Sequence, residues 1–348
     1  MNVGFGIVGL GMIAKFHALA IGAAEGGKLV ACFSRSREKA DAFAAEYGCR
    51  GYSSYPDFLA DPELDAVSIC TPSGAHMEPA MAAAAAGKHL LIEKPIEVTL
   101  KRCDRIIEEC LRKDVICAGI FPSRFWDPAM LIKEALDSSR FGRLTMGGAY
   151  AKYYRTQEYY DKGGWHGTWK YDGGGAVMNQ GIHAIDLLQW YMGPVDRIQG
   201  VTDTLGHTNT EVEDAATALI QFRNGAMGTI ECCTAVYPGY QKRIELGGTD
   251  GSVILVQDRL EAWSFKSETE RDAEIRQNYS GASRTGWGAS DPANVNYLGH
   301  QRQIDDFILA VERGHGPLVN GEEARKAVEI VLALYRSART RKPVTLPL

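Results

Sequence analysis

Short apolar runs alternate with segments of helical periodicity through the first third of the chain. Five runs have the length and the Val, Ile and Leu content of buried strands: 3–8, 29–33, 66–70, 89–93 and 115–121. The segments near these runs that place apolar residues at helical spacing are 15–21, 37–47, 76–87 and 99–113. Strands that alternate with helices in this way predict an α/β fold with a doubly wound parallel sheet.

The pattern changes after residue 122. Residues 128–138 predict a helix, and residues 144–155 predict a long strand. From 195 to 264, alternating apolar and polar positions predict a run of strands joined by short turns such as "RNGA" and "GTDG". A further helix is expected at 179–192.

We therefore expect two domains, 1–122 and 123–348, with the boundary within 120–127. Few helices follow residue 195, so part of the second sheet should be covered by another subunit, in a homodimer or a homotetramer. Residues 266–296 are polar and irregular. They are expected to form either a surface excursion or an arm of the functional site.

Composition narrows the class of protein. The 348 residues are 45% hydrophobic and 23% charged, with a net charge of −5 and no basic block, so no nucleic-acid partner is expected. No apolar run is long enough to cross a bilayer, and the apolar start lacks the basic region of a signal peptide. The eight cysteines are scattered without CxxC spacing, which indicates reduced thiols in a cytoplasmic protein and no metal site.

The sequence "GLGMIA" at 9–14 follows the first predicted strand and opens the first predicted helix. Gly9, Gly11 and Ala14 occupy the small-residue positions of a G-x-G-x-x-G/A turn. In such a turn Gly9 permits the sharp bend, and Gly11 lets a pyrophosphate approach the backbone N–H groups at the helix start, around Met12 and Ile13. This order of strand, turn and helix predicts a dinucleotide cofactor.

The end of the second strand distinguishes between cofactors. An acidic residue about 20 positions after the glycines would hold the ribose 2′-hydroxyl of NAD. Here Ser34 stands in that place, followed by Arg35 and Arg37. A hydroxyl with adjacent guanidinium groups suits a 2′-phosphate, which favours NADP over NAD. The alternative is that Arg35 and Arg37 are solvated side chains at the start of a helix and bind no phosphate.

Two further segments end strands at the carboxyl edge of the predicted sheet, where ligands bind in such folds. Thr71 and Pro72 are expected to line the cofactor cleft, and His76 is expected to pack there or to contact a ribose. "LLIEKP" ends the next strand with Glu93 and Lys94. A partly desolvated Lys94 beside the nicotinamide would donate or accept a proton, while Glu93 positions it or contacts the cofactor. The alternative is that Glu93 and Lys94 form a surface ion pair at the end of the strand.

These motifs together resemble the Gfo/Idh/MocA oxidoreductases, named for glucose–fructose oxidoreductase and inositol dehydrogenase. The resemblance rests on the glycine turn with His17, on "TPSGAH", "EKP" and "GGGAVMNQGIHAIDLLQW", and on the closing stretch 322–347. It implies a Rossmann domain, a C-terminal α/β domain with a large open, mostly antiparallel sheet, and catalytic residues at Lys94 and His183. Asn179 stands where inositol dehydrogenases have a carboxylate, which argues against inositol as the substrate.

Helical spacing places Asn179, His183, Asp186 and Trp190 on one face of the helix at 179–192. This face would suit one side of a catalytic site in which Asp186 orients His183. The alternative is that His183 is a buried histidine whose ring bonds Asp186. The preceding loop is rich in Tyr, Trp and Gly, whose aromatic faces suit a sugar ring, although they would also suit ordinary packing. The residues expected to contact the substrate are Arg124, Tyr153, Trp165, Trp169, Asn179, His183 and His300.

These observations predict an NAD(P)-dependent dehydrogenase that oxidises a secondary alcohol of a sugar, glycoside, sugar acid or cyclitol. His183 would take the hydroxyl proton while Lys94 polarises the oxygen, or the two would exchange roles, with Asp186 as the third catalytic residue. Two alternatives stay open. One is a glycosidase that oxidises its sugar transiently, and the other is a non-catalytic regulator that binds a dinucleotide, against which Lys94 and His183 argue.

Overall fold

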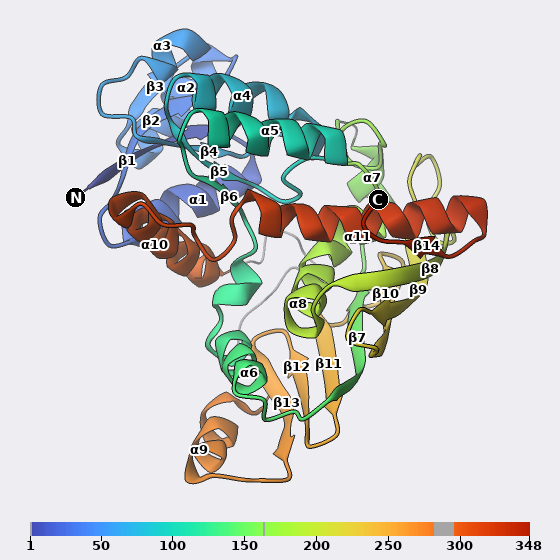
Figure 1. The fold of residues 1–348 in the computed structure, drawn as a ribbon. Helices are drawn as coiled ribbons and strands as arrows, with labels where there is room; N and C mark the ends of the chain where they lie inside the picture. The colour runs from blue at the N-terminus through green and yellow to red at the C-terminus, as the bar shows by residue number, and fades with distance from the viewer. Residues whose placement is uncertain (1, 163, 282–295) are drawn as a thin grey trace. The chain divides into compact units, whose positions relative to one another are not determined.

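The computed structural model describes residues 2–162, 164–281 and 296–348, which form two compact units (Figure 1). The first unit comprises Met1–Pro122, Lys170–Gly173 and Tyr297–Val328, and the second comprises the remaining segments, Ser123–Trp169, Gly174–Asn296 and Glu329–Leu348. Two segments that follow residue 122 in the sequence thus lie with the first unit. No helix of the described residues is long and apolar enough to span a membrane.

The first unit contains a six-stranded sheet whose paired strands all run parallel. The strand order is β3-β2-β1-β4-β5-β6. The strands are β1 (Val3–Val8), β2 (Gly27–Phe33), β3 (Arg50–Tyr52), β4 (Ala66–Ile69), β5 (His89–Ile92) and β6 (Cys117–Gly119). The order reverses between β1 and β4, and the crevice outside their carboxyl ends is where doubly wound sheets bind ligands. The predicted doubly wound parallel sheet is confirmed.

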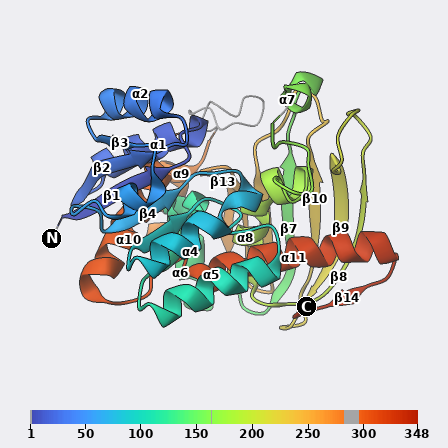
Figure 2. The ribbon, with the colours of Figure 1, turned by 90° about the horizontal axis from the view of Figure 1, so that it is seen from above.

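Helices from both ends of the sequence pack on this sheet. The helices are α1 (Met12–Ala23), α2 (Arg37–Tyr47), α3 (Tyr55–Leu59), α4 (Met77–Ala85), α5 (Leu100–Arg112) and α10 (Leu298–Arg313). Figures 1 and 2 both show α4 beside α5. On the other side, α10 lies against α1, and Phe307 packs 5.9 Å from the ring of Phe5 on β1. The core of this unit is therefore completed by a helix near the end of the chain.

The second unit contains an eight-stranded sheet of order β13-β12-β11-β7-β10-β9-β8-β14. Its strands are β7 (Leu144–Lys152), β8 (Val195–Asp203), β9 (Ala215–Phe222), β10 (Met227–Cys233), β11 (Arg243–Gly248), β12 (Gly251–Val256), β13 (Arg259–Phe265) and β14 (Val344–Thr345). Only the pairing of β7 with β10 is parallel among these described strands. The mostly antiparallel second sheet is therefore confirmed.

The two faces of the second sheet differ. Helix α8 (Ile182–Met192) packs against β7 and β11, and the last turns of α11 (Gly321–Thr340) pack against β8 through Leu334. Alternate side chains on the opposite face are exposed, including Met146 at 51%, Val201 at 71%, Leu219 at 63% and Met227 at 59%. The alternation of apolar and polar positions thus buries one face and leaves apolar side chains on the other.

The second unit also contains α6 (Asp127–Asp137), α7 (Gln157–Asp161), α9 (Glu270–Tyr279) and a π-helix at Ala176–Gly181. Residues 266–296 were expected to be irregular, but Glu270–Tyr279 within them form the helix α9. This helix begins at a capping box in which Thr269 and Asp272 each bond the other's backbone N–H. The part of that expectation at 282–295 lies outside the described residues.

Candidate functional site

The predicted cofactor motifs all lie at the carboxyl edge of the first sheet. The glycine turn follows β1, Ser34 follows β2, Thr71 follows β4, and Glu93 and Lys94 follow β5. Because the paired strands are parallel, their carboxyl ends share one edge. The fold therefore brings together segments that are up to about 85 positions apart in the sequence.

The glycine turn has the geometry that the motif requires. Gly9 has φ +89°, and a Cβ atom there would lie 2.8 Å from backbone atoms of Cys70 and Thr71. A Cβ atom at Gly11 would meet none of the described atoms within 4 Å, and no described side chain caps the start of α1 there. The start of α1 thus has open space at Gly11 and no capping side chain, beside the half-exposed Met12, and this arrangement fits a pyrophosphate.

His76 joins the two loops that follow β4 and β5. Its ring nitrogens lie 2.8 Å from the carbonyl oxygen of Thr71 and 2.9 Å from that of Pro95, and its side chain is buried. The hydroxyl of Thr71 donates to the carbonyl oxygen of Ala75 at 2.9 Å. His76 therefore packs between these loops and fixes the turn that carries Lys94.

A short segment from the middle of the sequence reaches the same loops. The N–H of Gly74 donates to the carbonyl oxygen of Tyr171 at 2.8 Å, and a Cβ atom at Gly74 would lie 2.1 Å from the carbonyl oxygen of Lys170. Residues 170–173 thus rest on the segment after β4, within the first unit. Gly74 is required by this close approach, which the motif "TPSGAH" did not by itself reveal.

The segment after β2 leaves one arginine available to a ligand. The hydroxyl of Ser34 accepts the N–H of Ser36 at 3.2 Å, and Arg37 binds Asp41 through a Nε–Oδ2 distance of 2.9 Å. Arg35 is exposed. A phosphate at this position would therefore be met by Arg35 before Arg37, which already has a carboxylate partner.

Lys94 occupies a tightly held turn. The Lys94–Pro95 peptide bond is cis, and the backbone N–H of Lys94 donates to Glu93 Oε2 at 3.0 Å. Glu93 Oε1 lies 2.8 Å from His17 Nε2, and His300 approaches the same oxygen. His300, which was predicted to contact the substrate, is buried in the first unit beside Glu93.

In the second unit, glycines and a buried acid shape the segment before His183. Glu213 accepts the N–H groups of Gly175 at 3.0 Å and Val177 at 2.9 Å, and the hydroxyl of Tyr335 at 2.7 Å. Burial raises the pKa of Glu213 more than these donors lower it. Glu213 thus holds the start of the π-helix and was not anticipated from the sequence.

The π-helix changes the expected face of this segment. Asn179 lies in the π-helix and is buried, while His183 is half-buried on the first turn of α8. A π-helix has i→i+5 hydrogen bonds, so the spacing of four between Asn179 and His183 does not describe a regular α-helical face. The face that was predicted from α-helical spacing therefore applies only from His183 onward.

Asp186 has a partner that the sequence did not indicate. Arg124 donates from Nε to Asp186 Oδ2 at 2.9 Å and from Nη2 to Oδ1 at 2.7 Å, and both side chains are 0% exposed. The guanidinium also lies 5.1 Å from the ring centre of Trp190. The Arg124 guanidinium thus binds Asp186 with both carboxylate oxygens and is fully buried, whereas it was predicted to contact the substrate.

A lysine that sequence analysis did not single out is buried nearby. Lys242 Nζ donates to the Ser123 hydroxyl at 2.6 Å and lies 4.4 Å from the ring centre of Trp126. Burial lowers the pKa of Lys242 to about 7, although Asp186 and Asp258 oppose this shift. Burial in an apolar environment thus determines the pKa of this amine more than any nearby carboxylate does.

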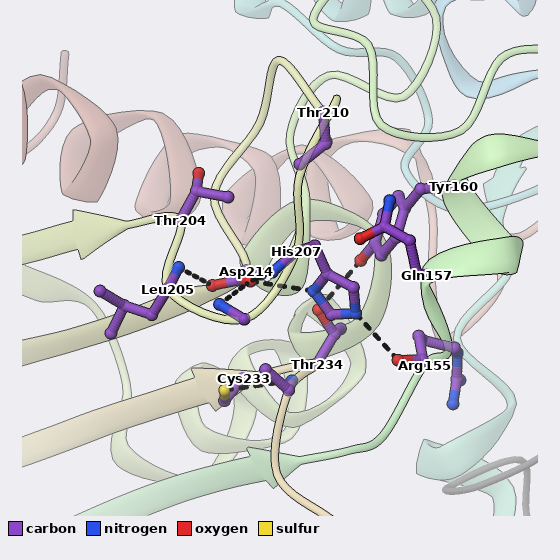
Figure 3. Close-up of polar contacts among 12 residues, drawn as sticks. Arg155, Gln157, Tyr160, Thr204, Leu205, His207, Thr210, Asp214, Cys233 and Thr234 are labelled. Atoms are coloured by element: carbon purple, nitrogen blue, oxygen red, sulfur yellow. Dashed lines mark hydrogen bonds and ion pairs between the residues drawn. The ribbon is translucent and has the colours of Figure 1, made fainter.

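Asp214 organises a loop at the end of β8 (Figure 3). Its Oδ1 accepts the N–H of Leu205 at 2.7 Å, and its Oδ2 accepts those of Gly206 and His207 at 2.8 Å each. His207 Nδ1 lies 2.9 Å from Oδ2, and Nε2 lies 2.9 Å from the carbonyl oxygen of Arg155. Burial raises the pKa of Asp214, but these N–H donors outweigh it and lower the pKa.

This loop faces the aromatic segment that was expected to bind a sugar. The Arg155 guanidinium lies 5.7 Å from the ring centre of Tyr153 and donates to Gln180 Oε1 at 2.8 Å. Tyr153 is buried, whereas Trp169 is 47% exposed and Trp165 is half-buried. Of the three aromatic residues expected at the substrate, the two tryptophans are therefore the more accessible.

Comparison with known proteins agrees with this fold and these motifs. Residues 3–121 match the model of the oxidoreductase family with an NAD-binding Rossmann fold, and residues 130–254 match the Gfo/Idh/MocA C-terminal domain. The chain belongs to the Gfo/Idh/MocA oxidoreductase family, as the sequence motifs predicted. It is therefore an oxidoreductase with an NAD-binding domain.

Similar proteins include several dehydrogenases. The crystal structure of the WlbA dehydrogenase from Bordetella pertussis in complex with NADH and UDP-GlcNAcA has a TM-score of 0.90 and 33% identity, covering 100% of this chain and 98% of that one. Myo-inositol 2-dehydrogenase from Thermotoga maritima is 26% identical over 98% of each chain. D-xylose 1-dehydrogenase (NADP(+)) 2 from Haloferax volcanii is 27% identical over 98% of this chain and 99% of its own.

Proposed function

We propose that this protein oxidises a secondary alcohol of a sugar derivative to a ketone, or catalyses the reverse reaction. The observation that carries the proposal is Lys94, held by Glu93 and His76 at the carboxyl edge of a sheet whose glycine turn fits a dinucleotide. A bound nicotinamide would accept the hydride that leaves the substrate carbon with its electron pair. The named relatives are dehydrogenases, which favours this function over the glycosidase and regulator alternatives.

The residues of this chain would handle the substrate oxygen and its proton. Lys94 would donate a hydrogen bond to the reacting oxygen and so stabilise charge that develops there. His183 would take the hydroxyl proton as the ketone forms, and would return it in the reverse reaction. Asp186 binds Arg124 through both carboxylate oxygens, and we propose that this pair fixes the start of α8, which carries His183.

We further propose that the substrate is a nucleotide-linked sugar acid. Support comes from the WlbA dehydrogenase, whose crystal structure holds UDP-GlcNAcA and which matches this chain along its whole length at 33% identity. Asn179, where inositol dehydrogenases have a carboxylate, argues in the same direction because an amide does not repel an acidic sugar. Trp165 and Trp169 are the aromatic residues proposed to contact the sugar ring.

The test is a substrate panel followed by the absorbance of the reduced nicotinamide. UDP-GlcNAcA, UDP-GlcNAc, myo-inositol and D-xylose would each be supplied with NAD⁺ and with NADP⁺. We expect UDP-GlcNAcA to exceed UDP-GlcNAc by about tenfold or more in kcat/KM, the size of one charge-assisted hydrogen bond to the carboxylate. Faster turnover of myo-inositol or D-xylose than of either nucleotide sugar would contradict the substrate proposal.

A further inference from the structure

Three titratable side chains converge behind the Lys94 turn from three parts of the first unit. His17 lies on α1, Glu93 directly follows β5, and His300 lies on α10. His17 Nε2 is 2.8 Å from Glu93 Oε1, and His300 Nε2 is 3.7 Å from the same oxygen. All three are buried, and His17 is 0% exposed. Burial of such groups is costly unless they are paired, so the arrangement has a specific cause.

The two oxygens of Glu93 have different neighbours. Oε1 faces the two imidazole rings, whereas Oε2 accepts the backbone N–H of Lys94 at 3.0 Å. The carboxylate therefore bridges the His17 ring and the peptide of Lys94. A negative charge on the residue next to Lys94 favours the positively charged form of the lysine, because Coulomb interactions fall with distance.

The protonation of the three groups follows from their surroundings. Burial lowers the pKa of His17, but Cys70 and Glu93 outweigh it and raise the pKa to about 10. Burial raises the pKa of Glu93, but hydrogen bonds and charge interactions with His17 and His300 bring it well below its usual value. Burial is the main cause that lowers the pKa of His300. At neutral pH the group thus contains one imidazolium, one carboxylate and one neutral imidazole.

The remaining neighbours are consistent with this assignment. Ser68 Oγ lies 2.6 Å from His17 Nδ1 and 3.8 Å from the Cys70 sulfur. His300 Nδ1 is buried and has no hydrogen-bond partner among the described residues, which suits an uncharged ring. The titratable groups that act on the two histidines from the described part of the chain include Cys70, directly after β4, and Lys94, after β5.

We propose that His17 and His300 are positioning residues for Lys94. They hold the Glu93 carboxylate so that one oxygen anchors the lysine's peptide and the negative charge stays next to the lysine. This inference deepens the proposed function and rests on it for the role of Lys94. The three residues act through the lysine, and they need no contact with the substrate.

The chain offers a matched control in Glu97. This carboxylate is also buried, and its Oε2 accepts the N–H of the next residue, Val98, at 2.7 Å. Its cationic partner is Arg102 at 2.9 Å, in place of a histidine. Glu97→Gln therefore removes a comparable buried charge from the same stretch of chain, away from the histidine group.

The first measurement needs no substrate. Lysines would be methylated with ¹³C-formaldehyde under reducing conditions, and the Lys94 signal would be identified by its loss in Lys94→Arg. In Glu93→Gln the NMR titration midpoint of Lys94 should fall by about half a pH unit or more, because the negative charge of the neighbouring residue is gone. In His17→Gln it should rise, because the carboxylate is then uncompensated, and in Glu97→Gln it should not move.

The inference would be overturned if the titration midpoint of Lys94 shifted equally in Glu93→Gln and Glu97→Gln. It would also be overturned if the midpoint did not shift in Glu93→Gln, or did not shift in His17→Gln. If Glu93→Gln does not fold, His17→Gln and Glu97→Gln decide alone. Stoichiometric zinc in the purified protein, lost in His17→Gln, would also overturn it, since the three side chains would then be metal ligands. These outcomes are independent of the substrate panel, so a failed panel leaves this test intact.

Discussion

At the scale of single residues, the buried pair of Arg124 and Asp186 shows how burial decides a role. Asp186→Asn would leave the guanidinium buried without its charge partner, at a cost of about 3–5 kcal/mol in the free energy of unfolding. Chemical denaturation measures this loss. Glu134→Gln is the control, because its pairing with Arg271 is exposed and should contribute about 1 kcal/mol or less. Equal losses in the two variants would contradict the assignment.

Arg35 is the residue that tests the choice of cofactor. If it binds a 2′-phosphate, Arg35→Ala should weaken NADPH binding by about 1.5–3 kcal/mol and leave NADH binding nearly unchanged. Arg37→Ala is the matched control, because Arg37 is already bound to Asp41. Fluorescence titration with both cofactors provides the dissociation constants. Equal affinity of the unaltered protein for NADH and NADPH would refute a preference for NADP.

At the scale of elements, the contact between α1 and the end of β5 makes stability depend on pH. His17 has a pKa raised from 6.5 to about 10, so its contribution to folding is complete below 6.5 and is lost as the pH rises through about 10. The difference in unfolding free energy between the natural protein and His17→Gln should therefore shrink from pH 7 to pH 10. A difference that is constant over this range would show that His17 is not protonated in the folded protein.

Several elements could be predicted from their own residues, and others could not. Periodicity and the glycine turn indicated β1, α1 and β5, because burial on a parallel sheet needs continuous apolar runs. The helix α9 was missed because its polar residues have little apolar periodicity, although the Thr269–Asp272 capping box marks its start. The π-helix was missed because Glu213, which holds it, lies far along the chain from the segment it binds.

Site residues followed the same division. The positions of Gly9, Gly11 and Lys94 at a turn and at a strand end could be predicted, because sequence motifs mark such local features. The partners of Glu93 come from α1 and α10, and that of Asp186 follows β6, so no spacing along the chain reveals them. Residues that are joined only by tertiary packing were therefore the ones that the sequence could not assign.

At the scale of the whole molecule, the exposed apolar side chains on the second sheet predict self-association. Leu219 and Val201 are more than 60% exposed on neighbouring strands, a costly arrangement for an isolated chain. We expect Leu219→Glu to lower the mass measured by light scattering to that of a monomer. Leu111→Glu is the control, because Leu111 is similarly exposed on α5 of the first unit. A monomeric natural protein at micromolar concentration would contradict this prediction.

The return of the chain to the first unit also could not be predicted from the sequence. Residues 170–173 and 297–328 lie with the first unit, where α10 supplies both core residues and His300. The apolar spacing of α10 predicts a helix but does not indicate which sheet it covers. A single boundary near residue 122 follows only the order of residues along the chain. It therefore does not assign the later segments 170–173 and 297–328 to the first unit.

The central claim is that Lys94 acts on the reacting oxygen, and single-turnover hydride transfer tests it most directly. With bound cofactor and saturating substrate from the panel, the rate in Lys94→Ala should fall by a factor of about 10²–10⁴, as expected for the loss of a positioned acid or base. The dissociation constant of the cofactor should change little, because the turn at Gly9 and Gly11 is untouched. A rate within about threefold of the natural protein, far inside the range expected for such a group, would contradict the account.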